Sequence, residues 1–178
     1  MQWSQPELCQ VPDFHLKNWL LDTGSLTERL QSHCRDFRVN VIGQKRAPLM
    51  ENERECMDPD TDYVVREVLL CAEQQPWVFA RSLLPVALCE ANQSEFSALG
   101  DQPLGRLIFN DSRFVRQPFQ LTCLAPDHRL CQQLGLNTYH PLWGRRSLFR
   151  FQQWQLMVAE IFLPQSPAYK LMARGKRL

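Results

Sequence analysis

Two charged residues, Arg66 and Glu160, lie at positions where the surrounding sequence is apolar. The runs that contain them, 63–70 and 154–163, have the composition of β-strands, in which alternate side chains share one face. The face of each charged residue otherwise carries large apolar side chains. A buried charge is costly unless a partner or a ligand satisfies it. The pattern therefore predicts a pocket with one fixed cation and one carboxyl group inside an apolar wall.

A small set of expected elements must position these residues. Alternating apolar residues predict strands, and a 3.6-residue periodicity with capping residues predicts helices. The expected strands are 37–42, 63–72, 77–86, 114–124 (weakened by Pro118), 144–151 and 154–163, and the expected helices are 13–22, 25–36, 94–99 and one that starts at Pro103. We expect a loop at 47–62 and an irregular excursion at 125–141. Two helices followed by an antiparallel sheet with short inserted helices indicate the α+β class.

Length and composition limit the class of protein. A chain of 178 residues is long enough for one domain, 1–178, with frayed ends at 1–8 and 170–178. A formal net charge of +1 gives no electrostatic case for binding nucleic acid. No apolar run approaches the length of a membrane span, and no signal peptide is evident, which favours the cytoplasm. The 7 cysteines form no C-x-x-C pair and the histidines show no ligand spacing, so no metal site is expected.

Four short stretches carry a resemblance that runs from about Cys9 to Tyr169. They are VREVLLC at 65–71 with the following Pro76 and Trp77, PLGR at 103–106, LWGRRS at 142–147 and EIFLP at 160–164. In this order and spacing they resemble the chorismate pyruvate-lyase family. The resemblance implies a lyase that converts chorismate to 4-hydroxybenzoate and pyruvate for ubiquinone synthesis. It also implies a monomer without a cofactor, whose six-stranded antiparallel sheet binds the ligand beneath helix-turn-helix flaps.

The same resemblance places the ligand contacts on four residues. Arg66 grips the ligand carboxylate, and Glu160 lies near the ring hydroxyl. The backbone amides of Leu26 and Leu104 are the other two contacts. Each of these leucines follows a residue that starts a helix, a capping-box serine or a proline. Free N–H groups at a helix start favour an anion, so three donors could converge on one carboxylate.

Chorismate carries two carboxylates, so a second arginine is expected, either Arg145 or Arg81. For Arg81 a surface salt bridge is the more ordinary interpretation. The expected cavity is closed and about the size of one benzoate ring. Two mechanisms stay open at this point. The site could mainly orient the side chain for a cyclic hydrogen transfer, or Glu160 could act as a general acid or base.

Other functions fit parts of the sequence. A sensor of small aromatic acids that lacks catalysis is the alternative, because effector domains of some bacterial transcription regulators resemble this fold. The two-helix segment 13–36 has a shape used for DNA binding, but it lacks a basic recognition face. The stretch 124–141 is longer than in the best-known members of the family, which leaves its effect on pocket access open.

Overall fold

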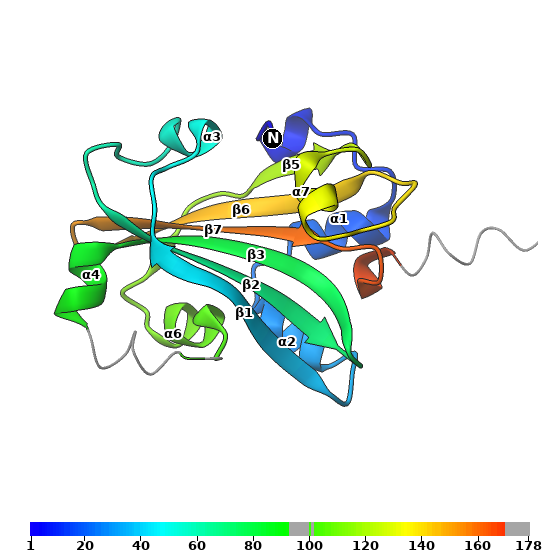
Figure 1. Ribbon diagram of the computed structural model, residues 1–178, viewed down its shortest axis with the longest axis horizontal. Coiled ribbons are helices and arrows are strands. Elements are labelled where there is room, and N and C mark those ends of the chain that lie inside the picture. The colour runs from blue at the N-terminus through cyan, green and yellow to red at the C-terminus, as the bar shows by residue number, and fades with distance from the viewer. Residues whose placement is uncertain (93–99, 101, 170–178) are drawn as a thin grey trace, which may run out of the picture.

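The computed structural model describes residues 1–92, 100 and 102–169 of the chain. One curved sheet with short helices around it confirms the α+β class (Figure 1). The strands are β1 (Phe37–Arg46), β2 (Tyr63–Ala72), β3 (Gln75–Pro85), β4 (Val115–Arg116), β5 (Gln120–Leu124), β6 (Leu142–Phe151) and β7 (Trp154–Phe162). The helices are α1 (Phe14–Leu20), α2 (Leu26–Gln31), α3 (Glu51–Arg54), α4 (Val86–Ala91), α6 (Leu104–Asn110) and α7 (Arg129–Gln133), with 3-10 turns at Pro6–Leu8 and Pro167–Tyr169. The expected helix at 94–99 and the tail 170–178 lie outside the described residues.

The sheet contains seven strands in the described residues, where six were expected, because the predicted edge strand forms two separate strands. Its order is β1-β2-β3-β7-β6-β4, all antiparallel, and β5 also pairs with β6. The predicted edge strand 114–124 is broken in two, because Pro118 has no N–H to donate to the ladder. Arg116 pairs with Phe149 on one side of the break, and Gln120 pairs with Arg146 on the other.

Tight turns join the two predicted hairpins, β2–β3 and β6–β7. Glu73 and Gln74 have φ angles of 49° and 66°, and Gln152 has a φ of 54°. Positive φ at turn residues matches the right-handed twist of the flanking strands, so these turns keep both hairpins short. Arg66 and Glu160 therefore lie on long strands that are held by adjacent partners.

A β-bulge interrupts the first hairpin. The register between β2 and β3 shifts by one residue between Leu70 and Cys71, with Trp77 as the extra residue. Residues directly opposite each other share a face of the sheet, so this shift decides which side chains of β3 join Arg66. The residue opposite Arg66 is Ser82.

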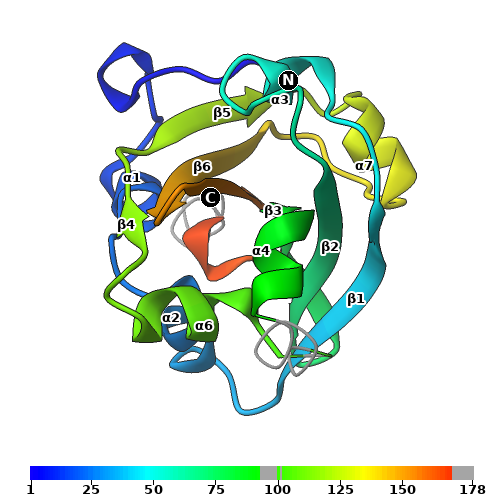
Figure 2. The same ribbon diagram turned by 90° about the vertical axis from the view of Figure 1, so that its left-hand side faces the viewer.

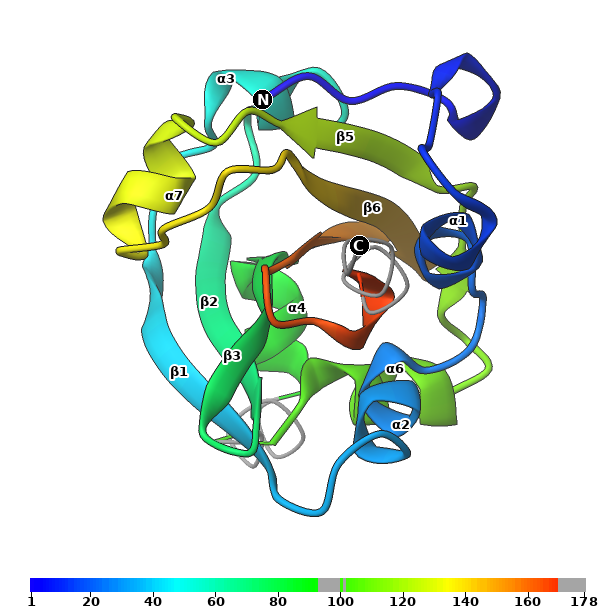
Figure 3. The same ribbon diagram turned by 90° about the vertical axis from the view of Figure 1, so that its right-hand side faces the viewer.

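The sheet curls strongly (Figures 2 and 3), and the helices α2 and α6 lie next to each other across its open side (Figure 1). On the inner face a row of opposed residues runs across four strands, from Arg66 to Ser82, Val158 and Ser147. A core cluster that includes Trp19, Leu30 and Phe162 packs α1 and α2 against this face. The two predicted helices of 13–36 thus cover the sheet, as expected of flaps.

Two segments that we expected to be irregular contain short helices. In 47–62, α3 forms because the buried carboxylate of Glu53 accepts a hydrogen bond from the Met50 N–H (2.8 Å) at the start of the helix. In 125–141, α7 forms with His128 as its N-cap and Cys131 buried beneath it. These helices depend on long-range burial and on single caps, which short windows of sequence do not reveal.

The N-terminal residues 1–8 are paired rather than frayed. Ser4 forms a β-bridge with Leu121, through hydrogen bonds of 2.9 and 2.8 Å, and the Thr122 hydroxyl donates to the Gln2 carbonyl. The start of the chain therefore covers the outer edge of β5. Within the described residues, none of the helices has the length and apolar character that a membrane span needs.

Candidate active site

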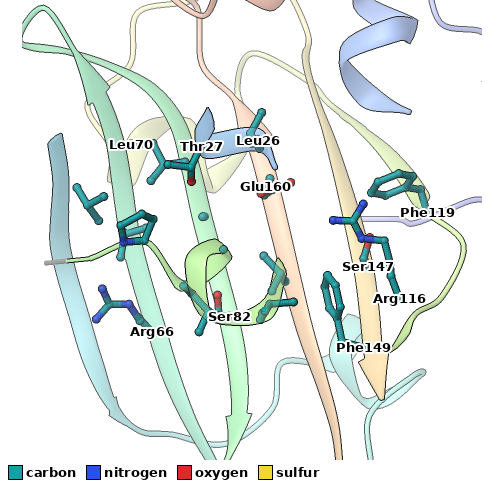
Figure 4. A pocket seen from close by; sticks show the side chains of 18 residues that line it. Leu26, Thr27, Arg66, Leu70, Ser82, Arg116, Phe119, Ser147, Phe149 and Glu160 are labelled. Carbon is teal, nitrogen blue, oxygen red and sulfur yellow. The ribbon is translucent and has the colours of Figure 1, made fainter. Parts of the chain in front are cut away.

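A cavity of about 50 Å³ lies between the inner face of the sheet and the helices α2 and α6 (Figure 4). Arg66, Glu160, Leu26 and Leu104 all line it, so the structure brings the four sequence-predicted residues together. Most of the remaining lining is apolar. The cavity is smaller than the benzoate-sized space that we expected, since a cavity that accepts benzene measures about 150 Å³. A ring-sized ligand therefore requires part of the lining to move outward.

Arg66 is held at one wall of the cavity. Its side chain is buried, and its Nη2 donates to the carbonyls of Gly100 (2.8 Å) and Gln102 (3.1 Å). Its Nη1 donates to the side-chain oxygen of Gln44 on β1. Two of these acceptors lie just before α6, so they fix the guanidinium beside the start of that helix. The planar guanidinium suits a bidentate contact with a carboxylate.

Glu160 is held by a buried arginine directly opposite on the neighbouring strand. The Arg145 Nε donates to Glu160 Oε2 at 2.7 Å, and the arginine side chain is buried. The Arg145 Nη1 also donates to the carbonyls of Trp19 (3.1 Å) and Asp22 (2.8 Å), at the end of α1. Arg145 therefore orients the Glu160 carboxylate and ties it to the flap.

Leu26 and Leu104 are the first residues of α2 and α6, as their preceding residues predict. The Ser25 hydroxyl accepts from the Glu28 N–H at 3.3 Å, which confirms Ser25 as the N-cap of α2. The first amides of a helix have no carbonyl acceptor within it. Both leucines line the cavity with their side chains largely buried, so the first turns of α2 and α6 both border it.

Arg81 lies on the opposite face of the sheet and does not line the cavity. It makes ion pairs with Glu53 (2.6 Å) and Glu67 (2.8 Å). Burial lowers its pKa, but the hydrogen bonds to Glu53 and Glu67 outweigh that effect and raise its pKa overall. Without the bulge at Trp77, the register would place Arg81 opposite Arg66 and inside the cavity. The salt bridge expected at Arg81 is present, although it is largely buried rather than at the surface, and the structure does not bring Arg81 to the cavity.

Arg145 is also absent from the lining of the cavity, because Glu160 stands between it and the interior. Two other polar residues line the cavity instead, Arg116 on β4 and Ser147 on β6. Sequence reasoning missed both. Ser147 lies in the LWGRRS motif, two residues from Arg145 and on the same face, which is the signal that could have found it. Arg116 lies in the broken edge strand. Only the pairing of Arg116 with Phe149 shows which face of the sheet its side chain is on.

In the part of the chain that the structure describes, no group of three or more histidine, cysteine, aspartate or glutamate residues is arranged to hold a metal ion. The groups with hydrogen-bonding capacity at the cavity are instead two arginines, one carboxylate, hydroxyls and backbone amides. This set can bind an acidic ring compound and orient it. The sequence profile described as chorismate lyase matches residues 1–173.

The chain belongs to the chorismate lyase family. Similar members include two proteins named "Probable chorismate pyruvate-lyase". The protein of Pseudoalteromonas atlantica is 49% identical over 174 residues, which cover 94% of this chain and 89% of the relative. The protein of Shewanella amazonensis is 42% identical over 173 residues, which cover 95% and 90%.

Solved structures of low sequence identity share the fold. The effector domain of PhnF from Mycobacterium smegmatis superposes with a TM-score of 0.57 at 15% identity, covering 81% of this chain and 91% of that one. The ligand-binding domain of a GntR-family regulator from Bordetella bronchiseptica gives a TM-score of 0.52 at 14% identity, covering 74% and 87%. These structural similarities show the fold of this chain and say nothing about its ligand.

Proposed function

We propose that this protein is a chorismate pyruvate-lyase, which converts chorismate to 4-hydroxybenzoate and pyruvate and so supplies the ring precursor of ubiquinone. The observation that carries the proposal is the presence of Arg66 and Glu160 on two strands that line one buried cavity. Membership of the family and the names of its relatives support the choice of chorismate as substrate.

In the proposed complex the ring carboxylate of chorismate lies at Arg66. The amides of Leu26 and Leu104, at the start of two helices that cover the cavity, provide two further donors. The ring hydroxyl lies at Glu160, whose carboxylate can accept its proton in a hydrogen bond. The ring then lies flat between apolar residues of the sheet and of α6.

The reaction breaks the ether bond between the ring and the enolpyruvyl oxygen. Hydrogen leaves the ring carbon that bears the hydroxyl and joins the methylene carbon of the side chain, which becomes the methyl group of pyruvate. The ether oxygen becomes the keto oxygen of pyruvate, and the ring gains the double bond that makes it aromatic. Oxidation state is conserved overall, so the proposed step requires no redox cofactor. Orientation of well-aligned groups can lower such a barrier by about 7–11 kcal/mol.

The function is tested by incubating the purified protein with chorismate and measuring both products. We expect 4-hydroxybenzoate and pyruvate in equal amounts, at a rate proportional to enzyme. Tight binding of 4-hydroxybenzoate without turnover of chorismate would contradict the proposal and indicate a sensor of aromatic acids on the same fold.

The variant Glu160→Gln separates orientation from acid–base catalysis. Glutamine keeps the size of the side chain and can still accept from the Arg145 Nε. We expect kcat to fall less than about tenfold, because general acid–base catalysis typically contributes about 10²–10⁴-fold. The matched control is Glu67→Gln, a carboxylate paired with Arg81 on the other face of the sheet. A loss of more than about a hundredfold only in Glu160→Gln would make the carboxylate an obligatory acid or base.

A further inference from the structure

Two arginines of the described lining, Arg66 and Arg116, lie on opposite sides of the cavity, with Glu160 between them (Figure 4). Arg66 is on β2 and Arg116 on β4, with β3, β7 and β6 in between. Four strand spacings correspond to about 19 Å along the sheet, and the curl of the sheet turns both side chains inward. A cavity with cations at both ends matches a ligand with two separated negative charges better than a ligand with one.

Arg116 is placed among aromatic rings near Glu160. Its guanidinium lies 4.9 Å from the Phe119 ring and 5.2 Å from the Phe149 ring, and its Nη1 donates to the Thr23 carbonyl at 2.9 Å. Burial, and then the nearby positive charge of Arg145, lower the pKa of Arg116. Because Arg116 is partly buried, an anionic ligand gains more from it than from a fully exposed arginine.

Ser147 provides a second, independent sign of a polar ligand at this end of the cavity. It is 4% exposed and lines the cavity, and its hydroxyl has no hydrogen-bond partner among the described residues. Ser147 is two residues from Phe149, the residue opposite Arg116, so it is the diagonal neighbour of Arg116 on the same face. Buried hydroxyls usually have a partner, and a ligand oxygen would supply one here.

The orientation of the ring in the proposed complex brings a charged group to this place. In chorismate the enolpyruvyl side chain is attached to the ring carbon next to the one that bears the hydroxyl. If the hydroxyl lies at Glu160, the side-chain carboxylate must lie at the Glu160 end of the cavity. Arg145 is also at this end, but its guanidinium is bound to Glu160 and to two carbonyls of the flap and does not line the cavity.

We propose that Arg116 and Ser147 form the subsite for the second carboxylate, the one that leaves as pyruvate. This inference rests on the proposed function and deepens it. Arg116 donates to the carboxylate from the edge of the sheet, and the Ser147 hydroxyl donates from β6. Arg66 holds the ring carboxylate at the other end. The product 4-hydroxybenzoate has a single carboxylate, which lies at Arg66. Once pyruvate departs, the subsite therefore holds no carboxylate.

The position of Arg116 also suits the departure of pyruvate. Arg116, Phe119, Phe149 and Ile108 line the inner cavity and also line an outer hollow of about 450 Å³. The proposed subsite therefore lies on the side of the cavity that is nearest to this hollow. In the proposed complex the carboxylate of the pyruvate moiety is therefore the one closest to the outside.

The test compares substrate and product in the variants Arg116→Gln and Ser147→Ala. For each, kcat and KM are measured with chorismate, and the Kd of 4-hydroxybenzoate is measured by titration. The control is Arg150→Gln, an exposed arginine next in sequence to Phe149 that does not line the cavity. We expect Arg116→Gln to lower kcat/KM for chorismate roughly 10- to 100-fold, since hydrogen bonds to charged groups are the strong ones. Ser147→Ala should lower it about three- to tenfold.

The Kd of 4-hydroxybenzoate should change less than about threefold in both variants, because the product does not use the subsite. Partial recovery of kcat/KM in Arg116→Lys would support a role for the charge. The inference is overturned if Arg116→Gln matches the Arg150→Gln control with chorismate, or if it weakens product and substrate equally. If the unaltered protein does not convert chorismate at all, the proposed function fails first, and that result is distinct from either of these.

Discussion

At the scale of single residues, the contact between Arg145 and Glu160 is central to the site. The buried Arg145 guanidinium donates to the Glu160 carboxylate at 2.7 Å and to the carbonyls of Trp19 and Asp22. A buried ion pair of this kind adds little net stability, because both charges lose their hydration. Its benefit is geometric, since it fixes where Glu160 lies relative to the ligand. We therefore propose that Arg145 is a positioning residue.

The variant Arg145→Lys tests this role. Lysine keeps the charge but is a single donor point, so it does not hold Glu160 and the flap carbonyls together. We expect kcat with chorismate to fall about tenfold or more. The matched control is Arg146→Lys, because Arg146 is equally buried but bonds to Gln120 and to the Asn52 carbonyl on the other face. Equal losses of kcat in the two variants, alongside equal losses of Tm, would mean that Arg145 is merely structural.

At the scale of elements, the close approach of β6 and β7 explains a glycine in the LWGRRS motif. A Cβ on Gly144 would lie 2.3 Å from Ile161 Cδ1 and 2.8 Å from the Glu160 carbonyl oxygen. Real contacts of this kind are longer, so any side chain here must push the two strands apart. The residue after Gly144 is Arg145, which means that the packing of these strands sets the geometry of the site.

The variant Gly144→Ala should therefore reduce both stability and activity. Overpacking in a well-packed core typically costs about 1–3 kcal/mol, and we expect a loss of that size in urea denaturation. The control is Gly43→Ala, where the nearest atom to an added Cβ is Glu67 Oε2 at 3.6 Å, an ordinary contact. Unchanged stability in Gly144→Ala would show that the strands accommodate a methyl group.

The flap formed by α1 and α2 is stabilised by contacts between its two helices. Arg29 on α2 donates to Asp22 Oδ2 at 2.6 Å and to the Asn18 carbonyl at 3.1 Å, and its guanidinium lies 3.8 Å from the Trp19 ring. These contacts tie α2 to α1. Burial raises the pKa of Asp22, but hydrogen bonds from the Gly24 N–H and from Arg29 outweigh it and lower the pKa overall. The pair therefore stays ionised at neutral pH.

Arg29→Ala should loosen the cover over the cavity. Partly exposed ion pairs contribute up to about 1 kcal/mol, so we expect the dissociation rate of 4-hydroxybenzoate to rise up to about fivefold. Stopped-flow displacement of the product measures this rate. Arg38→Ala is the control, because Arg38 pairs with Asp36 in an exposed position outside the flap. A dissociation rate that stays equal to that of the control would show that the cover does not open at α2.

At the scale of the whole molecule, the small volume of the cavity bears on the order of events in turnover. A volume of about 50 Å³ is smaller than that of a cavity that accepts benzene, so we expect the lining to move outward for substrate entry and again for product release. Opening of a lid is often slower than chemistry in enzymes of this kind. We therefore expect release of the product to limit the rate of turnover.

A pre-steady-state burst is the expected consequence. Rapid-quench measurement with chorismate in excess should give a first turnover faster than the steady state, with an amplitude near one 4-hydroxybenzoate per enzyme. Both rates are compared in the Arg29→Ala variant, where the steady state should accelerate and the burst rate should not. A linear first turnover would place the slow step in the chemistry or before it.

The sequence alone predicted the strands and the hairpins, and it placed Arg66 and Glu160 on apolar faces. It could do so because alternation along a strand and the preference for a turn are local properties of the chain. The Ser25 cap and the start of α6 were predictable for the same reason. Only the tertiary structure decided that Arg81 faces away from the cavity, because a one-residue bulge at Trp77 reverses every side chain beyond it. Likewise, Arg116 and Ser147 meet near Glu160 only because the sheet curls and an edge strand pairs with β6, which are contacts between residues far apart in the chain.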